Sequence, residues 1–272
     1  MAMDGEGQDL KLLATDLEAP RCLPAAGGLA CVYTARAPEK ETPNQDAAAV
    51  VCCDDTRCVL AVADGMGGLP FAAEAAGVAL EELCDAVRHA IDNQRDLRDG
   101  IINGFEKANA AIRNLHPGAG TTLAAVEIDN STMRTYHAGD SAIMAVGQRG
   151  RMRWQTVAHS PVGYAVEAGL LDAGEAMHHD ERHLVSNLVG SDEMRIDIGP
   201  PIALKIRDTV LLATDGLTDN LHGSEIVERI RKGRLNKAAT DLRSACTKRM
   251  QGNGDHPSKP DDLTFILFRP GM

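Results

Sequence analysis

Two apolar runs that each end in Asp-Gly constrain the fold of this chain more than any other feature. Val59–Ala63 leads directly into Asp64-Gly65, and Val210–Thr214 leads directly into Asp215-Gly216. Short apolar runs bounded by turn residues predict buried strands. A carboxylate at the end of such a strand must be solvated, paired or bound to a cation, because a buried lone charge is costly. The two runs therefore predict a sheet protein with acidic groups at the margin of its core.

Two further aspartates stand at comparable places. Asp140 lies in a tight turn between the predicted strands 133–137 and 142–146, and Asp261 comes just before the predicted last strand, 263–268. Strands can bring such groups together, and clustered carboxylates repel one another unless a cation intervenes. Mg²⁺ and Mn²⁺ prefer oxygen ligands. Two such ions can bridge a water, lower its pKa and present the hydroxide to phosphorus.

Hydrophobic periodicity predicts a layered α+β fold. Apolar residues recur at helical spacing over 72–87 and again over 97–115. Strands separated by short gaps follow, and such gaps permit only antiparallel neighbours. Helix pairs between groups of antiparallel strands are typical of sheets inside and helices outside. Strands are expected at 29–36, 47–53, 58–63, 122–128, 133–137, 142–146, 152–157, 209–214 and 263–268. Further helices are expected at 162–169, 174–178, 224–232 and 235–250.

The length allows a single large domain. The chain has 272 residues, of which 44% are hydrophobic and only 3% are aromatic, so the core must be built from Ala, Val, Leu and Ile. Residues 1–27 are polar and end in Gly27, so they predict a mobile lead-in before a domain over 28–270. Residues 159–203 have a mixed pattern.

Charge and cysteines bear on partners and location. The net charge of −11 opposes binding to nucleic acid or an anionic membrane, and the densest basic stretch, Arg229–Arg234, is interpreted as a solvated helix end. The first ten residues lack a basic, apolar leader, which favours a cytoplasmic location. The seven cysteines are expected to be reduced core thiols, with zinc binding as the minor alternative.

The ordered acidic motifs resemble those of the metal-dependent protein phosphatases, the PPM or type 2C family, in their bacterial form. The matching segments are Asn44-Gln45-Asp46, Val62-Ala63-Asp64-Gly65-Met66-Gly67-Gly68, Gly120-Thr121-Thr122, Ala138-Gly139-Asp140-Ser141, Ala213-Thr214-Asp215-Gly216-Leu217-Thr218-Asp219 and Asp261-Asp262-Leu263-Thr264. The resemblance covers about residues 28–269. It implies a central antiparallel β-sandwich flanked by helix pairs, in four α-β-β-α layers, with a flap at about 159–203 beside the active site.

The resemblance also implies a function and a set of ligands. The family hydrolyses phosphoserine and phosphothreonine in proteins with a hydroxide bridged by Mn²⁺ or Mg²⁺, in a site for two or three ions. Asp64 would bridge two ions, with the Gly65 carbonyl reaching the second; Asp215 and Asp261 would complete the first. Asp140 would share a third site with Asp215, and Asp46 would support the second ion. Phosphorylated proteins are the implied partners, together with a Ser/Thr protein kinase.

Three positions depart from the family pattern. Gln45 stands where Glu is usual, Asp262 replaces the more common Asn, and Met66 occupies a place where some relatives carry a histidine. The family also binds the substrate phosphate with an arginine shortly before the early motif. Arg36 is the candidate here because guanidinium binds phosphate bidentately, and Lys40 is the second choice.

Two other functions stay open at this stage. One is a catalytically weak module that binds phosphoproteins, and the other is a metal-dependent hydrolase of nucleotides or pyrophosphate, since two-metal sites cleave many phosphate esters. A serine hydrolase is rejected, because Gly139-Asp140-Ser141-Ala142 is not a nucleophile elbow and the flanking strands indicate a hairpin.

Overall fold

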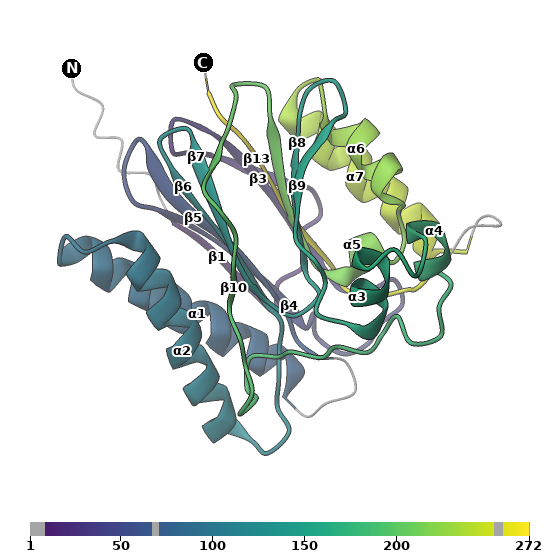
Figure 1. Ribbon diagram of the computed structural model, residues 1–272, viewed down its shortest axis with the longest axis horizontal. Helices are drawn as coiled ribbons and strands as arrows, with labels where there is room; N and C mark the ends of the chain where they lie inside the picture. The colour runs from purple at the N-terminus through teal and green to yellow at the C-terminus, as the bar shows by residue number, and fades with distance from the viewer. Residues whose placement is uncertain (1–8, 67–70, 253–257, 272) are drawn as a thin grey trace.

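Two antiparallel sheets pack face to face at the centre of the molecule, and helices cover their outer faces (Figure 1). The computed structural model describes residues 9–66, 71–252 and 258–271. The predicted α+β sandwich with flanking helix pairs is confirmed. Among the helices of these residues, none is both long and apolar enough to span a membrane.

The strands of each sheet come from distant parts of the chain. The first sheet has the order β1 (Leu10–Leu13), β4 (Asp46–Cys52), β5 (Arg57–Asp64), β6 (Leu123–Asp129), β7 (Thr132–Ala138) and β10 (Asp197–Ile198), and β11 (Ile202–Ala203) also pairs with β7. The second has the order β2 (Arg21–Ala25), β3 (Gly28–Ala35), β13 (Leu263–Arg269), β12 (Thr209–Ala213), β8 (Ala142–Val146) and β9 (Met152–Gln155).

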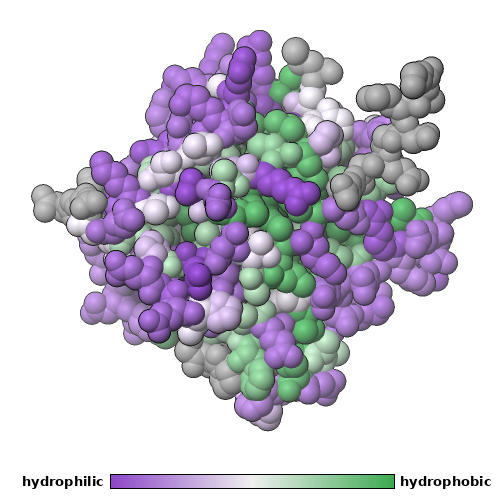
Figure 2. All heavy atoms as spheres, turned by 180° about the vertical axis from the view of Figure 1, so that it is seen from behind, coloured by the Kyte–Doolittle hydropathy of each residue, from purple (hydrophilic) through white to green (hydrophobic). Residues whose placement is uncertain are grey.

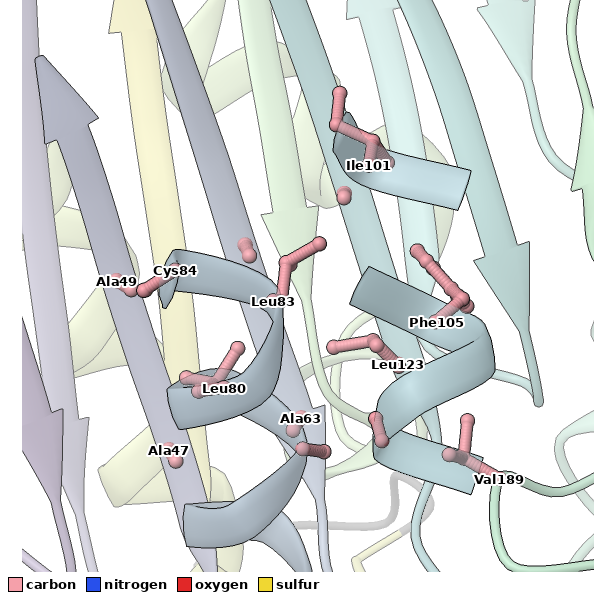
Figure 3. Packing of buried hydrophobic residues seen from close by; sticks show 14 of the residues in the cluster. Ala47, Ala49, Ala63, Leu80, Leu83, Cys84, Ile101, Phe105, Leu123 and Val189 are labelled. Atoms are coloured by element: carbon pink, nitrogen blue, oxygen red, sulfur yellow. The ribbon is translucent and has the colours of Figure 1, made fainter. Parts of the chain in front are cut away.

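Helices α1 (Ala72–Asp92) and α2 (Leu97–Leu115) cover the first sheet. Leu80 and Leu83 of α1 and Phe105 of α2 pack against the strands, where small residues such as Ala47 and Ala63 leave room for these larger side chains (Figure 3). A Cβ at Gly104 would lie 2.8 Å from the Leu83 Cα, so glycine permits the close helix contact. The predicted helical stripes are therefore the faces that pack on the sheet.

A second helix group covers the other sheet. It comprises α5 (Asp215–Thr218), α6 (Gly223–Ile230) and α7 (Leu235–Met250), whose Ile226, Ile230 and Leu242 are fully buried. Between the sheets lies a third apolar cluster that includes Leu60, Val126, Ile143 and Leu212. Viewed from behind, a mostly hydrophilic surface surrounds a central band of apolar residues (Figure 2).

The segment 159–203 contains two short helices, α3 (Pro161–Glu167) and α4 (Ala173–Ala176). The Ser160 hydroxyl accepts a hydrogen bond from Gly163 N at 2.9 Å, and Asp172 caps α4 in a capping box. The helices at these places were predicted, whereas the two-residue strands β10 and β11 were not, because two residues carry no periodicity.

The predicted mobile lead-in is wrong where residues 10–13 and 21–25 form strands β1 and β2. Leu10 pairs with Val50 across β1 and β4, and Arg21 pairs with Val32 across β2 and β3. Leu10 and Leu12 are buried, so this short alternation belongs to the core. A four-residue strand inside a polar segment was too short to stand out. Residues 1–8 lie outside the described residues.

The expectation that all cysteines are reduced is also wrong. Cys22 and Cys31 form a disulfide between β2 and β3. The two residues face each other directly in the antiparallel register, which brings their Cα atoms to 4.0 Å. Strand pairing, and not sequence spacing, therefore creates this bond. Cys58, Cys84 and Cys246 are buried thiols, as predicted.

Candidate active site

The aspartates that the sequence analysis singled out at strand ends lie at one end of the sandwich. Asp46 begins β4 directly opposite Asp64, the last residue of β5. In the second sheet, Asp215 follows β12 as the first residue of α5, and Asp261 precedes β13. Because antiparallel neighbours run in opposite directions, strand starts and strand ends meet at the same edge. The structure thus brings together residues that are far apart in the sequence.

Threonine hydroxyls hold the main chain around Asp64. The Thr121 hydroxyl donates to the Asp64 carbonyl at 2.8 Å, and the Thr122 hydroxyl accepts from the Asp64 amide at 3.1 Å. At the next residue, a Cβ on Gly65 would lie 2.1 Å from the Ala72 carbonyl oxygen. Only glycine therefore fits the tight approach to α1. Gly67 and Gly68, expected to shape the same loop, lie outside the described residues.

Asp140 lies at a crossover between the sheets and not in a hairpin. The preceding β7 belongs to the first sheet and the following β8 to the second, so the expectation of antiparallel neighbours is wrong here. Gly139 makes the bend with a φ of +116°, where a Cβ would lie 2.5 Å from the Thr122 Cβ. The buried Ser141 hydroxyl hydrogen-bonds the Thr122 hydroxyl at 2.7 Å. The rejection of a serine nucleophile now depends on the missing elbow motif alone, because the flanking strands form no hairpin.

The carboxylates destabilise one another's charged forms. Burial, with the Asp262 charge second, raises the pKa of Asp46 well above its ordinary value, and burial with the Asp46 charge does the same for Asp64. Burial and the Asp215 charge raise the pKa of Asp140 to about 7. They also raise the pKa of Asp261. Such a group of hard oxygen donors fits divalent cations, which would remove the repulsion.

A lysine that the sequence did not single out reaches into this group. Lys259 Nζ lies 2.6 Å from Asp215 Oδ2, 3.0 Å from Asp219 Oδ2 and 3.1 Å from Asp261 Oδ2. Burial disfavours its charge, but the three acids outweigh that effect and raise the pKa of Lys259. Asp219 follows Asp215 by one helical turn, a spacing that signals a shared face. Lys259 carries no comparable signal.

The two candidate phosphate ligands have different surroundings. Arg36 is half-exposed and forms an ion pair with Asp16, with Nε 3.1 Å from Oδ2. Lys40 Nζ instead lies 2.6 Å from Asp262 Oδ2 and donates to Gln45 Oε1 at 2.8 Å. Gln45 and Asp262, the two departures from the family pattern, therefore share one partner.

A histidine cluster next to the crossover was also missed. His137, His159 and Asp197 bring possible metal-ligand atoms within 4.8 Å of one another. The two rings stack with centroids 4.3 Å apart and 17° between their planes. Because a metal lies in the plane of each imidazole that binds it, stacked rings are poorly placed to share one ion. His159 Nδ1 accepts from Gly139 N at 3.1 Å, so the cluster supports the crossover.

Comparison with known proteins gives the family. The family model described as Protein phosphatase 2C matches residues 35–249. The chain belongs to this family. The protein phosphatase PhpP of Streptococcus pneumoniae is 34% identical over 196 residues, which span 69% of this chain and 78% of that protein. This member of the protein phosphatase 2C family is accordingly a serine/threonine protein phosphatase.

Solved structures of other phosphatases share the fold. The PPM Ser-Thr phosphatase MsPP from Mycobacterium smegmatis, in complex with cacodylate, gives a TM-score of 0.74 at 26% identity and covers 89% of this chain and 98% of that one. The catalytic domain of the phosphatase PstP, in complex with 2 manganese ions, gives 0.69 at 23% identity with the same coverages. The protein phosphatase 2C fold thus extends over nearly the whole chain.

Proposed function

We propose that this phosphatase hydrolyses phosphoserine and phosphothreonine monoesters of proteins at a site for divalent ions at the acidic end of the sandwich. The proposed ligands are Asp46, Asp64, the Gly65 carbonyl, Asp140, Asp215 and Asp261. The observation that carries the proposal is the meeting of strand-end carboxylates from both sheets. Their pKa values are raised by burial and by neighbouring carboxylates, and bound divalent cations would relieve that repulsion.

The proposed roles follow from position. Two Mn²⁺ or Mg²⁺ ions, when bound there, supply an activated water for in-line attack on phosphorus and neutralise the phosphate oxygens. Asp64 and Asp215 contribute from opposite sheets, so they hold the two sides of the site. Asp140 and Asp215 would hold a third ion. Arg36 would bind the phosphate bidentately from the segment that follows β3, after leaving Asp16.

Partners and location extend the proposal. The family's activity implies phosphorylated proteins as substrates, and a Ser/Thr protein kinase that produces them is the proposed functional partner. The cytoplasmic location, and the expectation that neither nucleic acid nor membrane is bound, stay predictions.

Asp64→Asn tests the site, with Asp241→Asn as its control. Asp241 is an exposed acid on α7 that pairs with Lys237. With saturating Mn²⁺, Asp64→Asn is expected to lose at least about a hundredfold in turnover of a phosphothreonine peptide, because losing even a residue behind a metal ligand costs 10–100-fold. Asp241→Asn should match the unmodified protein, and EDTA should abolish turnover.

Three outcomes would contradict the proposal. Near-normal turnover by Asp64→Asn, or turnover that survives EDTA, would reject the metal site. Faster turnover of nucleotides or pyrophosphate than of phosphopeptides would favour a different hydrolase. Failure to turn over p-nitrophenyl phosphate with saturating Mn²⁺ would favour a binding module.

A further inference from the structure

The position of Lys259 is fixed by its backbone. The buried side chain of Asn220 accepts a hydrogen bond from Lys259 N at 3.0 Å and donates one to the Lys259 carbonyl at 2.8 Å. The same amide donates to the Gly216 carbonyl at 2.9 Å. The main chain of Lys259 is therefore tied to α5, which begins at Asp215 and ends just before Asp219. The ammonium group is placed among the acids by this anchor and is not a loose surface charge.

The acids that Lys259 contacts include proposed metal ligands. Asp215 and Asp261 are both in the proposed set, and Asp219 lies beside them. The Lys259 side chain is 25% exposed, so water screens these contacts only in part. An ammonium and a divalent cation satisfy the same carboxylate oxygens, and they repel each other. Each therefore binds at the expense of the other.

We propose that Lys259 is a built-in cation that competes with divalent ions for the carboxylates of Asp215, Asp219 and Asp261. It stabilises the metal-free protein by neutralising these acids and weakens metal binding at the same place. The inference rests on the proposed metal site. When an ion binds, the lysine must release at least part of its contacts, which leaves its charge free to face the phosphate.

Metal affinity tests this role without reference to turnover. Chelator-treated, desalted protein would be titrated with Mn²⁺ by calorimetry, using Lys259→Met, Lys259→Arg and the surface control Lys237→Met. Lys237 pairs with Asp241 at 2.9 Å, where the side chains are 73% and 50% exposed. Lys259→Met should bind Mn²⁺ about tenfold more tightly, the change expected for losing a charge-assisted contact. The other two variants should bind like the unmodified protein.

Thermal stability gives a second readout. Without metal, Lys259→Met should melt at a lower temperature than the unmodified protein, and Mn²⁺ should raise its melting temperature by a larger increment. Lys259→Gln provides the same comparison if the methionine variant does not fold. Equal or weaker Mn²⁺ binding by the neutral variants would overturn the role of Lys259 alone. Absence of Mn²⁺ binding in every variant would overturn the metal site, and this inference with it.

A different observation concerns the opposite end of the sandwich. A cleft of about 1050 Å³ lies between the loop after β8 and the loop before β12. The sequence analysis did not single out this patch, whose basic residues come from the separate segments 149–153 and 205–207. The basic residues that line it are Arg149, Arg151, Arg153, Lys205 and Arg207. β8 and β12 each have their other end at the carboxylate site, so the cleft is remote from it.

Most of the positive charge in this cleft lacks an acidic partner. Asp208, the acid in the lining, pairs with Arg153 and accepts from Lys205 N at 2.8 Å. Within residues 9–66, 71–252 and 258–271, the other basic side chains of the cleft form no ion pair with a carboxylate. Ile206 also lines the cleft, with 54% of its surface exposed. The cleft therefore offers unpaired cations beside an apolar contact.

We also infer that this cleft binds an acidic segment of a protein partner. A long polyanion such as nucleic acid is repelled by the net charge of the whole chain, which is −11. A short acidic segment interacts mainly with charges within a Debye length of about 10 Å, which here are the basic residues of the cleft. A peptide can also place an apolar side chain against Ile206. These features favour a protein segment over nucleic acid.

Charge reversal tests the cleft. A fluorescein-labelled peptide of ten glutamates would be titrated with the unmodified protein, with Arg149→Glu/Arg151→Glu, and with the charge-matched control Arg95→Glu/Arg98→Glu on exposed positions near α2. Fluorescence anisotropy should show at least about tenfold weaker binding for the cleft variant only, with binding that falls as salt rises. Equal loss in both double variants, or tighter cleft-dependent binding of a DNA duplex than of the peptide, would overturn the inference.

Discussion

The ammonium group of Lys40 lies 2.6 Å from Oδ2 of Asp262, a carboxylate that is only 3% exposed. The same carboxylate accepts hydrogen bonds from Ala37 N at 2.8 Å and Gln45 N at 2.6 Å. It therefore joins the segment that carries Arg36 to the strand that follows Asp261. The charge of Asp262 at this family position is compensated by Lys40.

Removing one partner of this pair should cost stability. Lys40→Met leaves Asp262 buried without a cation, and we expect the free energy of unfolding to fall by about 2 kcal/mol. Lys40→Met/Asp262→Asn should recover part of that loss. Urea denaturation in EDTA gives the double-mutant cycle. Purely additive effects would contradict a direct Lys40–Asp262 interaction.

Gly216 should tolerate no side chain. A Cβ there would lie 1.8 Å from the Asp262 carbonyl oxygen, so Gly216→Ala must displace the main chain beside the site. We expect a loss of about 3 kcal/mol and a large drop in turnover. Gly223→Ala, where nothing lies within 4 Å of the added Cβ, should change stability by less than about 0.5 kcal/mol. Similar losses in both variants would contradict the packing argument.

The metal-free protein should lose stability as the pH rises toward neutrality. Burial and the Asp215 charge raise the pKa of Asp140 from 3.8 to about 7 in the folded state. A folded-state pKa above the unfolded value gives stability that is present below pH 3.8 and is lost as the pH passes 7. In EDTA, the melting temperature should therefore be lower at pH 8 than at pH 5.5.

Asp140→Asn is the matched variant for this titration. Its melting temperature should depend less on pH between 5.5 and 8, and saturating Mn²⁺ should flatten the dependence of the unmodified protein. The same slope in both proteins would show that other groups cause the effect.

Arg36 should affect substrate binding more than turnover. Arg36→Ala should raise KM for a phosphothreonine peptide about tenfold while kcat changes little, because a lost phosphate contact weakens the bound state. Asp16→Ala frees Arg36 from its ion pair and should not raise KM. An unchanged KM in Arg36→Ala would shift the role to Lys40, whose variant would be measured in the same assay.

The Cys22–Cys31 disulfide should stabilise the N-terminal strands. It closes a loop with a sequence separation of 9, and a loop of this size predicts a contribution of about 2–3 kcal/mol in the chain-entropy model. Dithiothreitol should lower the urea midpoint of the unmodified protein. Cys22→Ser should start from the lower midpoint and not respond. A response in that variant would indicate a different bond.

Much of the fold could be predicted because its elements are long and periodic. The stripes of α1 and α2 and the apolar runs of β4, β5 and β12 each span enough residues to show their period. β1 and β10 are too short, and their pairing depends on partners far along the chain. The sequence analysis predicted a hairpin between β7 and β8 because the connection is short. A connection of the same length also allows the chain to bend at Gly139 and enter the other sheet.

The site was predicted in part, for a related reason. Each aspartate at a strand end carries a local signal, namely an apolar run followed by an acid. Lys259 carries none, because its importance comes from Asn220 and from acids of another segment. His159 was missed likewise, since its hydrogen bond to Gly139 joins residues 20 positions apart. Local patterns reveal candidate ligands, whereas the groups that hold or neutralise them emerge from the tertiary structure.

The Thr214 hydroxyl donates to Asp46 Oδ2 at 2.8 Å and so links the end of β12 in one sheet to the start of β4 in the other. The distance between the two halves of the acidic group is therefore set by how the sheets rest on each other. Side chains buried between the sheets, such as Ile143 and Leu60, therefore help to set the distance between the acids of the two sheets without lying among those acids. We therefore expect substitutions that change the volume of these residues to alter turnover and stability together.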